Sequence, residues 1–278
     1  MLANSVADLQ RMMNAVEGFC RRWRLQVNMS KTKVVEFGSR GVGRANVTWK
    51  GEQLEEVTEY KYLGMLVVKG GRWKKTKEKM LRKAKRAAAM CWNLAVRAGN
   101  MSVKGMTNMW TALIRPHLEY GAEVLNSNMD PIWQEAEQLA RKVGRRVLKC
   151  GSRIPDEAVL AELGWMTMRG RRMLLRLSYW GKILGMDEGR WVRKVYEQGR
   201  ARLKDNARSN TWCNLTRKWL LELGLRREWQ DQAVGPGWQD KLRAKIEDRE
   251  AREWRRKALR KVKLQRFVQW KTRLGIEP

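Results

Sequence analysis

The chain has 278 residues and carries 59 Lys and Arg against 29 Asp and Glu, so its formal net charge is +30 and its isoelectric point is near 10.6. A protein this basic is expected to bind a polyanion, because its field attracts nucleic acid or an anionic surface. A composition with 43% apolar residues and 15 Trp excludes a chain that is disordered throughout.

The sequence also argues against a membrane span, a secretory signal and a structural zinc site. No apolar run approaches the ~20 residues that a spanning helix requires, so we expect no membrane partner. The first residues lack the basic start and long apolar stretch of a secretory signal, so we expect an intracellular, reducing compartment, either cytoplasm or nucleus. Cys20, Cys91, Cys150 and Cys213 are far apart, and only His117 is present to join them in a metal site.

The first 70 residues have the pattern of one helix and a small sheet. Apolar residues recur at helical spacing between residues 5 and 24, where Asn4 or Ser5 can cap the helix. Three β-like runs follow, separated by glycine-bearing turns, at residues 33–37, 46–49 and 60–68. This pattern predicts a partial domain over residues 1–70 that combines a helix with an antiparallel sheet.

From Gly70 onward the patterns are helical. Residues 72–97 hold ten Lys or Arg and one acid, Glu78, which predicts a strongly basic helix. Further helices are expected at roughly 102–114, 130–149, 169–185 and 211–223. After a linker at Gly235-Pro236-Gly237, residues 241–273 carry fourteen Lys or Arg against four acids in a long helical pattern. The expected fold class is therefore α+β and mostly α.

The helical part divides into three regions on these patterns. They are a helical region at 71–150, a second helical region at 151–234 and a basic helical tail at 235–278. The tail is interpreted as a helix that can fold against a protein partner.

No residue pattern in the sequence predicts a catalytic or metal centre. A nucleotidyl transferase or nuclease needs clustered carboxylates to hold divalent metals. The closest acidic groups, at residues 52–59 and 247–250, lie next to basic residues at spacings typical of solvated faces. His117 lacks a partner constellation, so a structural role is expected. Trp254 and Trp270, set among Lys and Arg, are candidates for stacking on bases, although packing explains them equally well.

Four segments in chain order resemble parts of non-LTR (LINE-type) reverse transcriptases. Residues 25–37 resemble palm motif D, and the run E-Y-K-Y-L-G-M at residues 59–65 resembles the hairpin of motif E, the primer grip. Residues 114–123 are similar to a stretch of the thumb region. Leu163-Gly164-Trp165, together with residues 177–182, is similar to the region that follows the thumb. The resemblance covers residues 1 to 185 and is looser beyond.

The resemblance implies a palm edge over residues 1–70, a thumb over 71–150 and a post-thumb region over 151–234. In this family a Y/F-A-D-D turn, whose aspartates bind magnesium, precedes the helix that the first residues match. The chain opens after that point, so we expect it to be inactive alone as an RNA-directed DNA polymerase. We also expect no cofactor, since magnesium would require the missing aspartates.

The resemblance also assigns site residues. Lys31 matches the motif D lysine that is implicated at the pyrophosphate leaving group, although a plain surface position is the simpler interpretation. Tyr60, Tyr62, Leu63 and Gly64 would form the primer-grip hairpin, with Gly64 in its turn. The thumb of this family lies against template and primer, which implies phosphate contacts for seven cations: Lys74, Lys75, Lys77, Arg82, Lys83, Lys85 and Arg86.

Three functional interpretations are open at this stage. The first is a truncated reverse-transcriptase-like protein that retains nucleic-acid-binding palm and thumb parts without the catalytic aspartates. The second is a repurposed, non-enzymatic nucleic-acid-binding or scaffold protein. The third is a polymerase whose missing palm arrives on another chain, which is disfavoured because such a cut exposes strand edges that normally pair. All three predict RNA or DNA as the partner.

Overall fold

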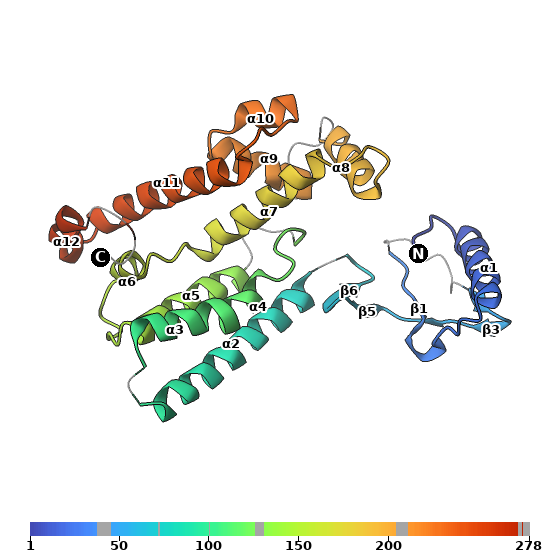
Figure 1. The fold of residues 1–278 in the computed structure, drawn as a ribbon, viewed down its shortest axis with the longest axis horizontal. Coiled ribbons are helices and arrows are strands. Elements are labelled where there is room, and N and C mark those ends of the chain that lie inside the picture. Colours follow the sequence, from blue (N-terminus) through green and yellow to red (C-terminus); the bar gives the residue numbers. More distant parts are fainter. Residues whose placement is uncertain are drawn as a thin grey trace. The chain divides into compact units, whose positions relative to one another are not determined.

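The computed structural model describes residues 1–37, 46–71, 73–99, 101–125, 131–203, 211–271 and 274. Over these residues the chain is mostly helical, with short strands near the N-terminus, which confirms the predicted α+β, mostly α class (Figure 1). It divides into two compact units, Met1–Lys77 and Glu78–Pro278. The finer subdivision of residues 71–278 stays a prediction.

In the first unit, helix α1 (Val6–Arg22) covers a small apolar core. Ser5 caps the helix as predicted, since its Oγ accepts a hydrogen bond from the amide of Asp8 at 3.0 Å. The Gln10 side chain fixes the helix to the strands, because it accepts from the Thr48 amide at 2.7 Å and donates to the Thr48 carbonyl at 3.0 Å. The core comprises Met13, Cys20, Val34, Val47, Trp49 and Leu54.

The strands of this unit form three separate pairs. They are β1 (Lys33–Val34) with β4 (Glu55–Glu56), β2 (Thr48–Trp49) with β3 (Glu52–Gln53), and β5 (Glu59–Tyr62) with β6 (Met65–Val68). The last two pairs are antiparallel, whereas β1 and β4 are parallel, so the predicted all-antiparallel sheet is corrected. The strands β3 and β4 were not predicted, because their glutamates are poor strand formers. Backbone pairing and the Lys33–Glu55 ion pair hold β4 in place.

The second unit contains most of the helices. In chain order they are α2 (Lys74–Arg97, which starts in the first unit), α3 (Val103–Met109), the π-helical turn η2 (Trp110–Ile114), α4 (Arg115–Glu119), α5 (Pro131–Val147), α6 (Asp156–Leu163), α7 (Met168–Leu184), α8 (Trp191–Ala201), α9 (Trp212–Glu222), α10 (Arg226–Asp231), α11 (Trp238–Leu259), the 3₁₀ turn η3 (Val262–Leu264) and α12 (Gln265–Trp270). The helices α4, α6, α8 and α10 were not predicted. Three of them, α4, α6 and α10, have eight residues or fewer, too few for a clear apolar period.

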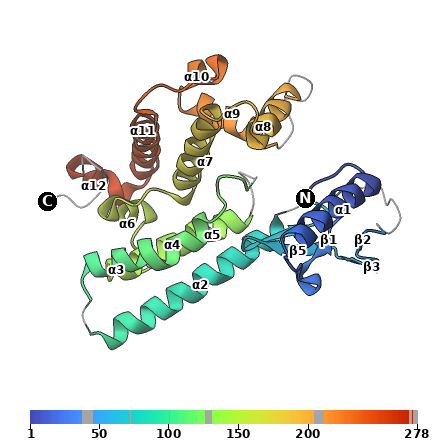
Figure 2. The ribbon, with the colours of Figure 1, turned by 45° about the vertical axis from the view of Figure 1, so that its right-hand side comes forward.

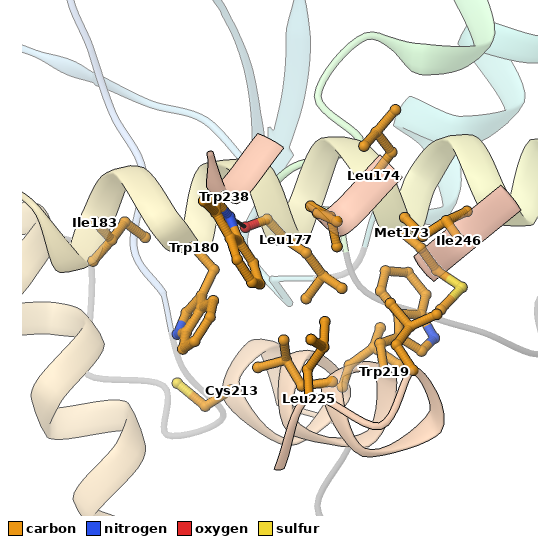
Figure 3. Packing of buried hydrophobic residues seen from close by; sticks show 14 of the residues in the cluster. Met173, Leu174, Leu177, Trp180, Ile183, Cys213, Trp219, Leu225, Trp238 and Ile246 are labelled. Carbon is orange, nitrogen blue, oxygen red and sulfur yellow. Dashed lines mark hydrogen bonds between the residues drawn. The ribbon is translucent and has the colours of Figure 1, made fainter. Parts of the chain in front are cut away.

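Helix α7 lies at the centre of this unit, and the surrounding helices bury it on most of its sides. Met173, Leu177 and Trp180 are fully buried in a cluster that α9 and α11 complete (Figure 3). The indole N–H of Trp180 is satisfied, because it donates to the Tyr196 hydroxyl at 2.9 Å. Buried aromatic residues from four helices contribute to this core: Trp180, Tyr196, Trp219 and Trp238. The Trp180 indole is thus buried with its polar group hydrogen-bonded.

The first turn of α7 is capped by carboxylates from two other helices. The Glu250 side chain of α11 accepts from the Thr167 amide at 3.0 Å, and the Glu137 side chain of α5 accepts from the Arg169 amide at 2.7 Å. The first amides of a helix have no intrahelical acceptor, and the helix dipole favours negative charge there. Glu250 is 8% exposed, so it is a buried cap and not the solvated acid that the sequence analysis expected.

The basic tail is part of this same core. Leu242 and Ile246 of α11 are fully buried against α7, so most of the apolar side of this helix is buried by the chain itself, although Leu259 is 47% exposed. The close approach of α11 to α7 depends on Gly181 of α7, where an added Cβ would lie 2.5 Å from the indole nitrogen of Trp238. That nitrogen donates to the Leu177 carbonyl at 3.3 Å.

We expect Gly181→Ala to destabilise the second unit by about 1–3 kcal/mol, because the new methyl group overlaps Trp238 and separates α7 from α11. The midpoint of urea unfolding, followed by circular dichroism, measures the change. Gly185→Ala is the matched control, since its Cβ would meet only the carbonyls of Lys182 and Gly181, at an ordinary 3.8 and 4.0 Å. Equal midpoints for the two variants would contradict this account of the helix contact.

The cysteines are expected to differ in reactivity. Burial raises the pKa of the Cys213 thiol to about 11, so it remains protonated at pH 8, whereas Cys150 is only half-buried. Because the thiolate is the reactive form, maleimide at pH 8 should label Cys150 at least about ten times faster than Cys213. Peptide mass spectrometry measures both rates. In denaturant the two rates should converge, and equal rates in the folded protein would contradict the burial of Cys213.

Candidate nucleic-acid interface

The segment that resembles motif D forms a tight turn in the first unit. Asn28 accepts from the Lys31 amide at 3.1 Å and so starts the 3₁₀ turn η1 (Met29–Lys31). The Lys31 carbonyl in turn accepts from the hydroxyl of Tyr60 at 2.9 Å, while its ammonium group is exposed. The structure thus joins the two segments that resemble motifs D and E, through a contact that sequence spacing alone did not reveal.

The segment that resembles motif E is the hairpin of β5 and β6. Its two turn residues, Leu63 and Gly64, have φ values of 46° and 82°, which is typical of a two-residue type I′ turn. Gly64 therefore occupies the turn as predicted, and Leu63 adopts a left-handed conformation that is unfavourable for its side chain. Tyr62 and Leu63 are 61% and 72% exposed at the tip.

The hairpin is attached to the start of α2 within the first unit. The hydroxyl of Thr76 donates to the Leu66 carbonyl at 2.7 Å and accepts from the Leu66 amide at 3.0 Å. Lys75 forms an ion pair with Glu59 of β5. Lys74 and Lys75 are exposed, and Lys75 lies beside the end of the hairpin opposite its tip.

The acids around the hairpin are paired with lysines. Lys69 contacts Glu36 at 2.7 Å and Glu56 at 3.9 Å, and the hydrogen bond with Glu36 raises the pKa of Lys69. Glu55 and Glu59 pair with Lys33 and Lys75. Among the described residues, no three His, Cys, Asp or Glu side chains gather closely enough to hold a metal ion.

In the second unit, α2 presents cations to solvent. Arg82, Lys83 and Arg86 are exposed and form no ion pair with any residue that the structure describes. Lys85 is exposed too, but it contacts Glu135 of α5 at 2.8 Å. The opposite side of the helix is apolar and buried, at Met80, Leu81, Ala84, Ala88, Cys91 and Ala95. The helix is therefore amphipathic, with its cations outward.

Lys77 is not part of this cationic surface. Its side chain is only 4% exposed, so the predicted phosphate contact is corrected for this residue. The physical reason is helical periodicity: Lys77 precedes Leu81 and Ala84 by four and seven residues and so lies on their buried face. Charge alone therefore misassigned one of the seven predicted cations.

The segment that resembles the family's thumb stretch has a structural role here. The Arg115 amide donates to the Trp110 carbonyl five residues back, and this π-helical turn accommodates Pro116, which has no amide hydrogen. Glu119 then holds α7 through Arg171, with contacts of 2.6 and 3.2 Å. His117 is half-buried within this short helix, α4.

A buried arginine of α7, Arg176, also contacts the segment that follows α4. Arg176 of α7 is 1% exposed and donates to the carbonyl of Leu125, and the rings of Trp212 and Trp219 lie 5.7 and 5.2 Å from its guanidinium. Burial, and secondarily Arg172, lowers the pKa of Arg176, but it remains protonated at neutral pH. Sequence reasoning had no signal for this residue, because a buried Arg inside an apolar period looks like a solvated one.

Comparisons of the chain with protein families, with curated proteins and with solved structures found no match. Among the described residues, no helix is both long enough and apolar enough to cross a bilayer. The functional assignment therefore depends on the residues of the chain itself.

We expect Leu63→Asn to stabilise the hairpin by about 1 kcal/mol, because Asn-Gly suits a type I′ turn and little apolar burial is lost at an exposed position. Amide hydrogen exchange at Tyr60–Val68 in the full chain should slow. A control variant, Tyr62→Asn, changes an exposed neighbour outside the left-handed region and should not slow exchange. Faster exchange in the Leu63 variant would contradict the strain argument.

Proposed function

We propose that this chain binds nucleic acid through its phosphate backbone, as a reverse-transcriptase-like protein of the non-LTR class that retains a palm edge and thumb. The observation that carries this proposal is the outward row of unpaired cations on α2: Arg82, Lys83 and Arg86. Like charges four residues apart destabilise a helix by a few tenths of a kcal/mol, and phosphate groups would offset this repulsion.

The hairpin in the first unit supplies a second type of contact in this proposal. Tyr62 and Leu63 offer exposed apolar surface for a sugar or a base, and Lys74 and Lys75 offer cations in the same unit. The order of the four segments along the sequence supports the same assignment. A truncated polymerase-derived protein and a repurposed binding protein share this interface.

In this proposal Lys31 is a surface residue and takes no part in catalysis. The acids near it are paired with lysines, and polymerisation depends on metal-held triphosphate. We therefore expect no magnesium-dependent primer extension by the chain alone. A primed RNA template with all four deoxynucleotides measures this, and extension that disappears with chelator would overturn the non-polymerase part of the proposal.

The α2 surface predicts a change in salt dependence. Replacement of Arg82, Lys83 and Arg86 by Gln should lower the slope of log K against log salt by up to about 2.7 for duplex DNA, because each phosphate contact contributes about 0.9. Fluorescence anisotropy between 50 and 300 mM salt, roughly the range over which such binding is lost, measures the slope.

A matched control removes the same charge elsewhere on the second unit. Its three exposed positions are on α8, α9 and α10: Arg200, Lys218 and Arg227, each replaced by Gln. The slope of this control should stay near that of the wild type. An equal loss in both variants would mean that net charge alone acts, and would contradict the assignment of α2.

A further inference from the structure

The C-terminal end of α11 and the turn and helix that follow, η3 and α12, carry a second concentration of positive charge. Between residues 252 and 266 there are eight Lys or Arg and one acid, Glu253. All eight cations are exposed: Arg252, Arg255, Arg256, Lys257, Arg260, Lys261, Lys263 and Arg266. We call these eight residues the C-terminal basic face.

The acids nearby neutralise only part of this charge. Glu253 is shared, since Lys257 lies 2.8 Å, Arg249 3.1 Å and Arg256 3.7 Å from its carboxylate. Hydrogen bonding to Lys257 accordingly lowers the pKa of Glu253. Arg252 contacts Asp248 at 3.1 Å, and Lys261 pairs with Glu157.

Four members of the face remain outside these pairs. They form no ion pair with any residue in the described ranges: Arg255, Arg260, Lys263 and Arg266. Arg252, Arg256 and Arg260 also follow one another at intervals of four, which places like charges side by side on the helix. Asp248 and Glu253 offset this repulsion only in part, and Arg260 has no ion pair with a described residue, so a bound polyanion is the natural counterpart.

Most apolar residues of this region point inward, whereas Leu259, Val262 and Trp270 are 47%, 81% and 83% exposed. Trp254 is 9% exposed, and its indole N–H donates to the Glu157 carbonyl at 2.8 Å, so it is a core residue and not a stacking platform. Ala258, Leu264 and Val268 complete a small core against α6. A helix that binds a membrane surface presents a broad apolar side to the lipid, whereas exposed cations outnumber the exposed apolar residues here. Trp270 borders the face.

The C-terminal basic face and α2 lie on opposite sides of the second unit. Helices α5 and α7 separate them: Lys85 of α2 contacts α5, Glu137 of α5 caps α7, and Trp238 of α11 contacts α7. Figures 1 and 2 show α2 and α11 at the two edges of this unit in both views. Because α5 and α7 lie between the two surfaces, a straight duplex that lies along one surface is kept from the other.

We propose that the C-terminal basic face is a second nucleic-acid contact, so that the second unit binds two separate phosphate backbones. This inference rests on the proposed function for the class of ligand, but it uses different residues. Single phosphate contacts with the unpaired cations provide affinity, and Trp270 provides an exposed ring at the border of the face for stacking.

A bridging experiment on the full chain tests this proposal. Two 12-bp duplexes, one with a donor fluorophore and one with an acceptor, are mixed with monomeric protein at about 0.1 M salt, where phosphate contacts are strong. DNA and RNA duplexes of the same sequence form separate arms. The variant replaces Arg255, Arg260, Lys263 and Arg266 by Gln, and circular dichroism confirms that it is folded. The α2 variant and the α8–α10 control variant are run beside it.

We expect the wild type and the control to bring the duplexes together, with energy transfer between the fluorophores. The C-terminal variant should lose this transfer, with affinity for the second duplex reduced at least about tenfold, while it still binds one duplex. The α2 variant should also retain one duplex. Transfer in only the DNA or only the RNA arm would identify the backbone that bridges.

Other outcomes overturn the inference. Unchanged energy transfer in the C-terminal variant would overturn the inference. If the α2 variant alone lost energy transfer, the inference would be overturned but the proposed function would stand. Unchanged binding in both variants would overturn both proposals. Loss of binding to phosphatidylserine vesicles without any change in duplex binding would assign the face to an anionic membrane instead.

Discussion

The second unit depends on how the first turn of α7 is satisfied. The Thr167 amide donates a hydrogen bond to the Glu250 carboxylate of α11 at 3.0 Å, and the Arg169 amide donates one to the Glu137 carboxylate of α5 at 2.7 Å. The two carboxylates come from helices that are distant in the sequence. Orphan amides at a helix start need acceptors, and the helix dipole strengthens the interaction with a carboxylate. The same two contacts therefore fix the positions of α5 and α11 relative to α7.

This use of acids has a consequence for the surface. Glu119 holds Arg171, Glu222 holds Arg249 at 2.5 Å, and Asp156 accepts from Arg141 at 3.1 Å. Several carboxylates of the unit are thus engaged between helices, while Arg82, Lys83 and Arg86 on α2 and four cations of the C-terminal basic face have no ion pair with a described residue. The strong positive charge of the chain is thus distributed unevenly, and both proposals concern the places where it is not compensated.

The segments that resemble reverse transcriptases divide into two kinds. The hairpin exposes Tyr62 and Leu63 at its tip, where a ligand can reach them. The stretch around Pro116, in contrast, forms a π-helical turn and then connects α4 to α7 through Glu119. A motif that is recognisable in sequence can therefore mark a packing junction as well as a contact surface, and solvent exposure distinguishes the two.

The sequence by itself determined the fold class, the turn position of Gly64 and the basic character of α2, and it limited the cap of α1 to Asn4 or Ser5, because each depends on local propensity or on periodicity. The tertiary structure decided which charges are available. Lys77, Arg176 and Glu250 are buried, while Arg82 and Arg255 are exposed, and no local pattern separates these groups reliably. Burial of a charged side chain depends on partners distant in the chain, such as Leu125 for Arg176 or Thr167 for Glu250, and only the folded chain brings those partners together.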